Sequence, residues 1–121
     1  MFKKKFAYTK RLNEALRVME KYPDRAPIIV EKSNHATDIP NIDRKKYLVP
    51  KDITVAEFIY IIRKRLYNIN PKDFTADKAL YFFVNNSCMA VPNQSINMLY
   101  ETHKDEDNFL YITYAGESTF G

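Results

Sequence analysis

Few side chains in this sequence are suited to covalent catalysis. Cys88 is the single cysteine among 121 residues, and His35 and His103 are the two histidines. A cysteine nucleophile reacts as its thiolate and needs a neighbouring imidazole to take the proton. No motif typical of such enzymes surrounds Cys88. We therefore expect no catalytic residues and interpret Cys88 as a small apolar side chain near a strand end. A single cysteine also excludes an internal disulfide, which fits a reducing compartment.

Metal and nucleotide sites lack the residues that they require. Two distant histidines do not make a ligand set, and acidic residues 105–107 lack the glycine and the spacing of a calcium loop. The only two glycines are Gly116 and Gly121, which excludes a glycine-rich phosphate cradle. We therefore expect no metal and no cofactor, and a solvated turn at residues 105–108.

The sequence ends at Phe120 and Gly121. A C-terminal glycine has no side chain, so its carboxyl is open to adenylation and then to attack by a thiol or an amine. The polar residues 117–119 form a lead that a narrow enzyme channel can admit. A terminal glycine also arises by chance at ordinary glycine usage, so it becomes informative only together with a matching fold.

Residues 46–49 predict a strand that stops at Pro50, as is natural for the edge of a sheet. Alternation places Lys46 and Leu48 on one face and the other two side chains on the opposite face. An exposed edge accepts an extended peptide as an additional strand, and each face can then line a pocket for alternate residues of that peptide. Basic residues 44–46 would attract acidic residues beside the anchors. An ordinary sheet edge protected by lysines explains the pattern equally well.

The positive charge is concentrated at the start of the chain. The net charge is +4, but residues 1–25 carry +5 and the remainder carries −1. Such a segment suits nucleic acid, an anionic lipid or an acidic partner, although a solvated helix face is the simpler interpretation. The aromatic run at residues 81–83 lacks the glycine and basic neighbours of an RNA-binding sheet. We therefore expect no nucleic-acid partner.

Length and composition indicate one soluble domain. The chain is long enough for a single core, and its 45% hydrophobic and 28% charged residues are typical of globular proteins. The longest apolar run, at residues 58–62, is too short to cross a bilayer, and no secretory signal follows the first lysines. We expect a cytoplasmic protein.

Apolar periodicity, helix caps and prolines predict a helix, two strands, a helix, a strand, a short helix and a final strand. Thr9 would cap the first helix, which Pro23 ends, and a shorter helix precedes it at residues 3–6. The apolar stripe of the longer helix, which ends before Pro23, would be Tyr8, Leu12, Ala15, Leu16, Met19 and Tyr22. Strands are expected at residues 28–30, 46–49, 80–84 and 109–114, with 80–84 central because both of its faces are apolar. The second long helix would bury Val55, Phe58, Ile59, Ile62 and Leu66.

Two capping signals fix helix starts, a capping box at Thr54 to Glu57 and Ser95 before a helix to about residue 103. Basic residues 63–65 would lie at the end of the second long helix, where cations suit the helix dipole. Four strands around one capped helix predict an α+β domain of the ubiquitin-like kind with a helical extension in front. The expected divisions are residues 1–25 for that extension, 26–115 for the core and 116–121 for a flexible tail.

Several motifs, in order along nearly the whole chain, resemble the autophagy-related protein 8 family, which includes the GABA-A receptor-associated protein and microtubule light chain 3. These motifs are KYPDRAPIIVEK at 21–32, DRKKYLVP at 43–50, FIYIIRKR at 58–65, FVNN at 83–86 and YITYAGESTFG at 111–121. The resemblance implies a ubiquitin-like β-grasp fold with two N-terminal helices.

The same resemblance implies a modifier rather than an enzyme. Gly121 would be activated by an E1-like enzyme, passed to an E2-like enzyme and joined covalently to phosphatidylethanolamine, and a cysteine protease would reverse the conjugation. The lipid would hold the domain on an autophagosome or a related vesicle membrane. Cargo receptors and adaptors with aromatic-x-x-aliphatic motifs would dock on it.

The resemblance also implies three groups of site residues. The first peptide pocket would be lined by Glu14, Val18, Pro27, Ile29, Lys46, Leu48 and Phe109. The second would be lined by Tyr47, Val49, Pro50, Ile53, Phe58 and Ile61, with Arg65 beside it. Contacts with processing and conjugation enzymes would come from Tyr81, Phe83, Phe109 and Phe120, and a plain core role is the alternative for these aromatics.

Three features depart from the family's pattern. The loop at residues 68–77 is longer than usual, residues 87–94 lack paired prolines and contain Cys88, and Asn108 replaces a common glycine. These departures bear on partner choice rather than on the fold. Two alternatives to a conjugated modifier remain at this point, a non-conjugated peptide-binding adaptor in trafficking or cytoskeletal attachment, and a basic RNA-binding domain.

Overall fold

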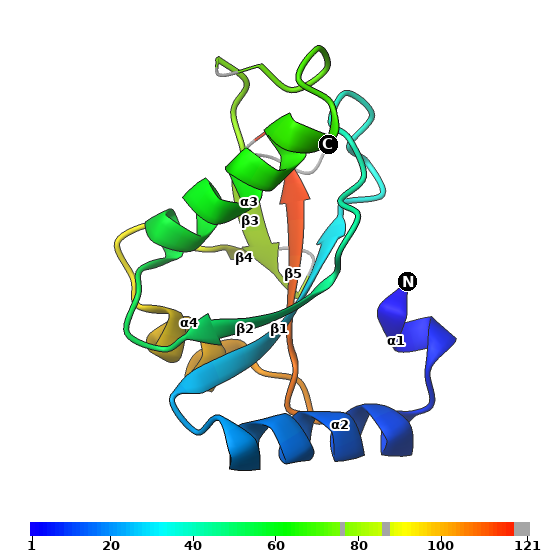
Figure 1. Cartoon of the computed structure of the whole chain (residues 1–121), viewed down its shortest axis with the longest axis vertical. Helices are drawn as coiled ribbons and strands as arrows, with labels where there is room; N and C mark the ends of the chain where they lie inside the picture. The colour runs from blue at the N-terminus through cyan, green and yellow to red at the C-terminus, as the bar shows by residue number, and fades with distance from the viewer. Residues whose placement is uncertain (76, 86–87, 118–121) are drawn as a thin grey trace.

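The protein is a five-stranded mixed sheet with helices on both faces (Figure 1). The structure, a computed structural model, describes residues 1–75, 77–85 and 88–117. In chain order its elements are α1 (Phe2–Lys5), α2 (Tyr8–Lys21), β1 (Arg25–Lys32), β2 (Lys46–Pro50), α3 (Val55–Ile69), β3 (Tyr81–Val84), β4 (Cys88–Met89), α4 (Ile96–His103) and β5 (Leu110–Ala115).

The strands lie in the order β2-β1-β5-β3-β4, so β2 forms one edge. β1 pairs with β2 in antiparallel fashion and with β5 in parallel fashion, while β3 is antiparallel to both β5 and β4. The prediction of a central strand at residues 80–84 was wrong in its placement, because β5 is the middle strand. β3 is nevertheless an inner strand, and the two-residue β4 beside it is too short to leave a sequence signal.

The main core lies between α3, α4 and one face of the sheet. It includes the expected α3 stripe of Val55, Phe58, Ile62 and Leu66, with Ile59 packed against it. The capping box is present, since Thr54 Oγ1 accepts from the Glu57 backbone and Glu57 Oε1 accepts from the Thr54 N–H. α3 continues to Ile69, so the basic residues 63–65 lie before its last turn rather than at its end.

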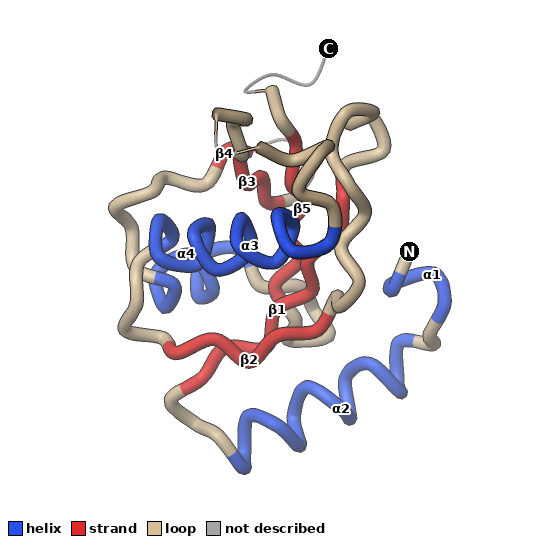
Figure 2. Tube along the Cα trace, turned by 45° about the horizontal axis from the view of Figure 1, so that its top comes forward, coloured by secondary structure: helices blue, strands red, loops and turns tan. Residues whose placement is uncertain are grey.

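The opposite face of the sheet is covered by α1 and α2 (Figure 2), and a smaller cluster of Phe2, Ala15, Ile29 and Phe109 is buried there. The predicted stripe of α2 was only partly right. Ala15 is buried, but Tyr8 and Leu16 are 45% and 47% exposed, and Arg11 is buried instead. Thr9 is not the cap either: Ala7 occupies that position without a side-chain hydrogen bond.

The turn before β5 explains one local departure from the expected sequence pattern. Asn108 has a φ of 70°, in the left-handed region that glycine adopts without strain and asparagine tolerates. That geometry accounts for a glycine or an asparagine immediately before Phe109. Cys88 lies in β4 as expected for a strand end, but it is exposed rather than a filler of the core. Among the described residues, no helix is long and apolar enough to cross a membrane.

Candidate functional site: the β2 edge and the hollow beside it

The outer edge of β2 presents backbone groups that pair with no other strand of the described residues. Val30 N–H donates to the Lys45 carbonyl at 2.8 Å, and antiparallel pairing uses every second residue for such bonds. The register therefore turns the backbone of Tyr47 and Val49 toward β1 and the backbone of Lys46 and Leu48 toward the open edge. Pro27, which has no N–H, lies opposite Leu48, as this alternation requires.

Arginine side chains donate hydrogen bonds to the outward-facing carbonyls of this edge. Arg44 Nε donates to the Lys46 carbonyl at 3.0 Å, and an Arg25 guanidinium N–H donates to the Leu48 carbonyl at 3.5 Å. Both bonds are solvent-exposed, so a peptide backbone could replace them. The edge is thus protected against uncontrolled strand pairing but remains accessible to a guest strand.

A hollow of about 190 Å³ opens beside this edge, between α2, β1, β2 and the start of β5. Six of the seven residues predicted for the first pocket line it, and the structure adds two that the sequence reasoning did not assign there. The predicted six are Glu14, Val18, Pro27, Lys46, Leu48 and Phe109, and the additions are Arg44 and Tyr47. Ile29, the seventh, lies in the buried cluster that also contains Phe109.

An ion pair stands among the walls of this hollow. Lys46 Nζ lies 2.8 Å from Glu14 Oε2, and the two side chains are 51% and 30% exposed. Such an exposed pair contributes little to stability, so an arriving anionic group can exchange for Glu14 at small cost. The hollow combines an apolar floor at Phe109 with a cation at its rim. That combination suits an aromatic side chain flanked by acidic residues.

The residues predicted for the second pocket lie around the contact of β2 with α3. Val49 and Phe58 are buried in the main core, and the Tyr47 ring meets Phe58 edge-on at 5.8 Å. The remaining members, which offer surface, are Tyr47, Pro50, Ile53, Ile61 and Arg65, with Ile61 47% exposed. The structure therefore makes Val49 and Phe58 the support of this region.

Arg65 is fixed beside this region by a two-pronged ion pair. Its Nε and Nη2 lie 2.7 and 3.2 Å from the two carboxylate oxygens of Asp43. The hydrogen bond from Arg65 lowers the pKa of Asp43 below its ordinary value. Because Asp43 is part of the chain leading into β2, the pair ties that chain to α3.

A buried network that the sequence did not reveal holds α2 against β5. The Arg11 guanidinium is paired with Asp107, which is fully buried, and Tyr111 donates to the same carboxylate at 2.5 Å. The other Asp107 oxygen accepts from Phe109 N–H at 2.8 Å. Burial and the bond to Asp107 raise the pKa of Tyr111, so it remains a neutral donor. The network thereby positions Phe109, the floor of the hollow.

Comparison with known proteins identifies the family. The family model described as "Autophagy protein Atg8 ubiquitin like" matches residues 10–121. Autophagy-related protein 8e of Arabidopsis thaliana is 50% identical over all of this chain and 93% of its own length. The chain belongs to the Atg8 family. Autophagy-related protein 8 of Mycosarcoma maydis is 48% identical over 99% of this chain and 95% of its own.

A solved Atg8 structure agrees with the fold. The crystal structure of Trypanosoma brucei ATG8 superimposes with a TM-score of 0.84 at 38% identity, covering 99% of this chain and 97% of that one. The family assignment and the ubiquitin-like fold expected from the sequence are thereby confirmed. The chain is accordingly an Atg8-family, ubiquitin-like autophagy protein.

The aromatics expected to meet Atg8-processing enzymes differ in what surface they offer. Phe83 and Phe109 are 2% and 3% exposed, whereas Tyr81 is half-buried at the start of β3. Of these three, Tyr81 offers the most surface to an enzyme. Phe120 and Gly121 lie outside the described residues, as does most of the expected tail at 116–121. Within the described part of the chain, no group of three or more His, Cys, Asp or Glu side chains is placed to hold a metal.

Proposed function

We propose that this Atg8-family chain is a ubiquitin-like modifier that is conjugated through Gly121 to phosphatidylethanolamine and serves as a docking platform in autophagosome formation. It would be a substrate of E1-like and E2-like enzymes, not a catalyst, and a cysteine protease would release it from the lipid. Its conjugated form would reside on autophagosomes or related vesicles and its free form in the cytoplasm. Membership of the Atg8 family and the terminal Gly121 support the conjugation half of this proposal.

The observation that carries the docking half is the open backbone of Lys46 and Leu48 beside the 190 Å³ hollow. A guest peptide would form an additional strand on β2 and place its aromatic anchor over Phe109. Acidic residues before the anchor would meet Lys46 and Arg44. An aliphatic anchor three residues later would reach the surface formed by Tyr47, Pro50, Ile53 and Ile61.

Reconstituted conjugation tests the modifier role. The chain is incubated with matching E1-like and E2-like enzymes, ATP and liposomes that contain phosphatidylethanolamine, and its intact mass is measured. We expect a lipid-sized mass gain that is absent when Gly121 is deleted. No gain, with enzymes shown to be active on another Atg8 protein, would favour the second candidate, a non-conjugated peptide-binding adaptor. That adaptor remains a candidate because the β2 edge and the hollow do not depend on Gly121.

Calorimetry with a synthetic peptide tests docking. The peptide carries acidic residues before an aromatic-x-x-aliphatic motif. Leu48→Ala removes part of the hollow's wall, and we expect it to weaken binding about tenfold. Lys46→Ala should also weaken binding. Lys45→Ala is the matched control, because Lys45 Nζ pairs with Glu31 at 3.0 Å and does not line the hollow.

A second peptide tests the mode of binding. Proline at the residue that donates to the β2 backbone removes that donor, so binding by strand addition should weaken. Unchanged affinity for this peptide and for the Leu48 variant would remove the docking claim while leaving conjugation open.

A further inference from the structure

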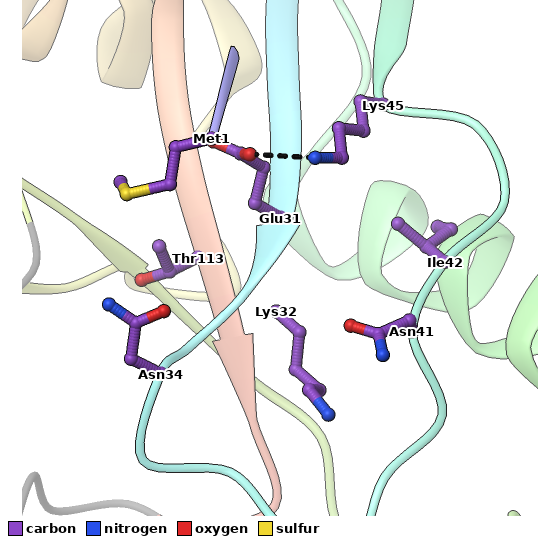
Figure 3. Close-up of a pocket in the computed structure, with 8 residues that line it drawn as sticks. All are labelled: Met1, Glu31, Lys32, Asn34, Asn41, Ile42, Lys45 and Thr113. Carbon is purple, nitrogen blue, oxygen red and sulfur yellow. Dashed lines mark hydrogen bonds and ion pairs between the residues drawn. The ribbon is translucent and has the colours of Figure 1, made fainter. Parts of the chain in front are cut away.

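A second hollow of the molecule lies away from the proposed peptide site. A cavity of about 400 Å³ lies where β1 continues past the end of its pairing with β2. Figure 3 shows the side chains that surround it, from the end of β1, the segment between β1 and β2, β5 and the N-terminal residue. Its lining is Met1, Glu31, Lys32, Asn34, Asn41, Ile42, Lys45 and Thr113. The volume falls in the range of small-molecule sites.

Several polar groups in this lining have no partner within the described residues. Thr113 Oγ1 is buried and makes no hydrogen bond. Lys32 has no ion pair, and neither Asn34 nor Asn41 makes a side-chain hydrogen bond in that part of the chain. A buried hydroxyl without a partner is unfavourable unless something completes it. Asn34 and Asn41 are exposed, and together with Lys32 and the buried Thr113 hydroxyl they line the same cavity.

The backbone contributes one more donor. Ser33 N–H donates to the Tyr114 carbonyl at 2.9 Å, which directs the odd-numbered residues at this end of β1 toward β5. Val30 N–H donates in the opposite direction, to Lys45. By the same alternation Lys32 N–H points to the side where β2 has already diverged. An amide and an ammonium of one residue therefore both face the cavity region.

The charges in this cavity select an anion rather than a cation. Glu31 is the single carboxylate among the described residues of the lining, and it already accepts from Lys45 Nζ at 3.0 Å and from Phe2 N–H at 3.1 Å. Lys32 and Lys45 are both cationic, so the lining carries net positive charge. Ammonium groups, amides and a hydroxyl are the donors that a phosphate oxygen requires. The lysine-rich α1 lies beside this cavity and extends the positive surface.

We propose that this cavity binds a phosphate ester, the phosphorylated headgroup of an anionic membrane lipid. Lys32 would pair with the phosphate. Asn34, Asn41 and Thr113 would donate to the phosphate oxygens or to the hydroxyls of an inositol ring in the headgroup. The site does not depend on conjugation: the free chain would use it, together with the basic α1, to settle on a membrane surface. The cavity lies at the end of the sheet that holds Thr113 and the last residues of β5.

The test uses the unconjugated full chain and two probes. Soluble inositol bisphosphate is titrated while backbone amide resonances are followed by NMR, and binding to phosphatidylcholine vesicles with and without phosphatidylinositol phosphate is measured by sedimentation. We expect shifts at Lys32, Asn34, Asn41 and Thr113. Lys32→Gln should weaken affinity at least about tenfold, the effect of one charged hydrogen bond. Lys104→Gln is the control, since Lys104 does not line the cavity and pairs with Glu101 at 3.3 Å.

Thr113→Val provides a variant that keeps the shape of the side chain. It removes the unpartnered hydroxyl, so the protein should be at least as stable while inositol bisphosphate binds more weakly. Vesicle binding that requires the phosphorylated lipid and is lost in Lys32→Gln would establish the lipid source. Binding of the soluble probe alone would support the site but contradict that source. No shifts, shifts confined to residues 3–5, or equal affinities of Lys32→Gln and Lys104→Gln would overturn the proposal.

Discussion

The helices on the two faces of the sheet are attached by different interactions. On the α3 face, a large apolar cluster runs from Ala26 to Tyr114 and is closed by the stripe of α3. On the α2 face, the cluster of Phe2, Ala15, Ile29 and Phe109 is small, and charged groups complete the attachment. The hollow beside β2 lies on this second face. The proposed recognition would therefore use the face where the apolar cluster is small and charged contacts fix the geometry.

Phe58→Ala should have the largest effect on stability. Its ring is 1% exposed and lies 5.8 Å from Tyr47 and 5.6 Å from Phe82, so truncation leaves a cavity in the main core. We expect a loss of about 4 kcal/mol in the free energy of unfolding. Denaturant titration measures it, with Tyr60→Ala on the same helix as control because Tyr60 is 61% exposed. A loss below about 1 kcal/mol would contradict the apolar account of this face.

Asp107→Asn tests whether the other face depends on charge. It leaves the Arg11 guanidinium buried without a counter-charge, which typically lowers stability by about 3 kcal/mol. Combining it with Arg11→Met, which replaces the guanidinium by an apolar side chain, should restore part of that loss. A double-mutant cycle in denaturant measures the coupling. Additive losses would show that Arg11 and Asp107 do not act as a pair.

Acid should weaken the α2 face through a smaller pair. Lys3 Nζ lies 2.5 Å from Asp105. Burial raises the pKa of Asp105, but hydrogen bonds from Lys3 and from the Asp107 backbone more than offset this, so its pKa is lowered overall. A lowered pKa stabilises the fold above the unfolded value near 4, and that stability is lost as the pH falls further.

The expected loss is below about 1 kcal/mol, because the pair is partly exposed. Unfolding of the wild type and of Lys3→Gln is compared at pH 5 and pH 3. The variant should lose less stability between those pH values. An identical pH dependence of the two proteins would remove Lys3 from the explanation.

The difference between the apolar α3 face and the partly charged α2 face also explains which features could be predicted from the sequence. Apolar periodicity identified the α3 stripe, and capping chemistry identified Thr54 and Ser95, because these signals are local. The burial of Arg11 was not predicted, because a charged residue within a helical stripe is normally solvated. Its partner lies 96 residues away in the sequence. For the same reason Tyr8 and Leu16 were wrongly assigned to the buried side of α2.

Alternation and family resemblance predicted which residues would lie together beside β2, and their role in binding a peptide stays a prediction. Lys46, Leu48 and Phe109 line one hollow as expected, whereas Arg44 was expected only as an attractor of acidic residues. The orientation of the β2 backbone could not be read from residues 46–50 alone. It depends on the register against β1, which only the assembled sheet defines.

Amide hydrogen exchange on β2 tests the central claim most directly. The chain is measured with and without a peptide that carries the aromatic-x-x-aliphatic motif. Strand addition predicts new protection at the Lys46 and Leu48 amides, which face the open edge, and little change at Tyr47 and Val49, which already face β1. Binding without new protection at Lys46 and Leu48 would contradict the account, because the peptide would then occupy another surface.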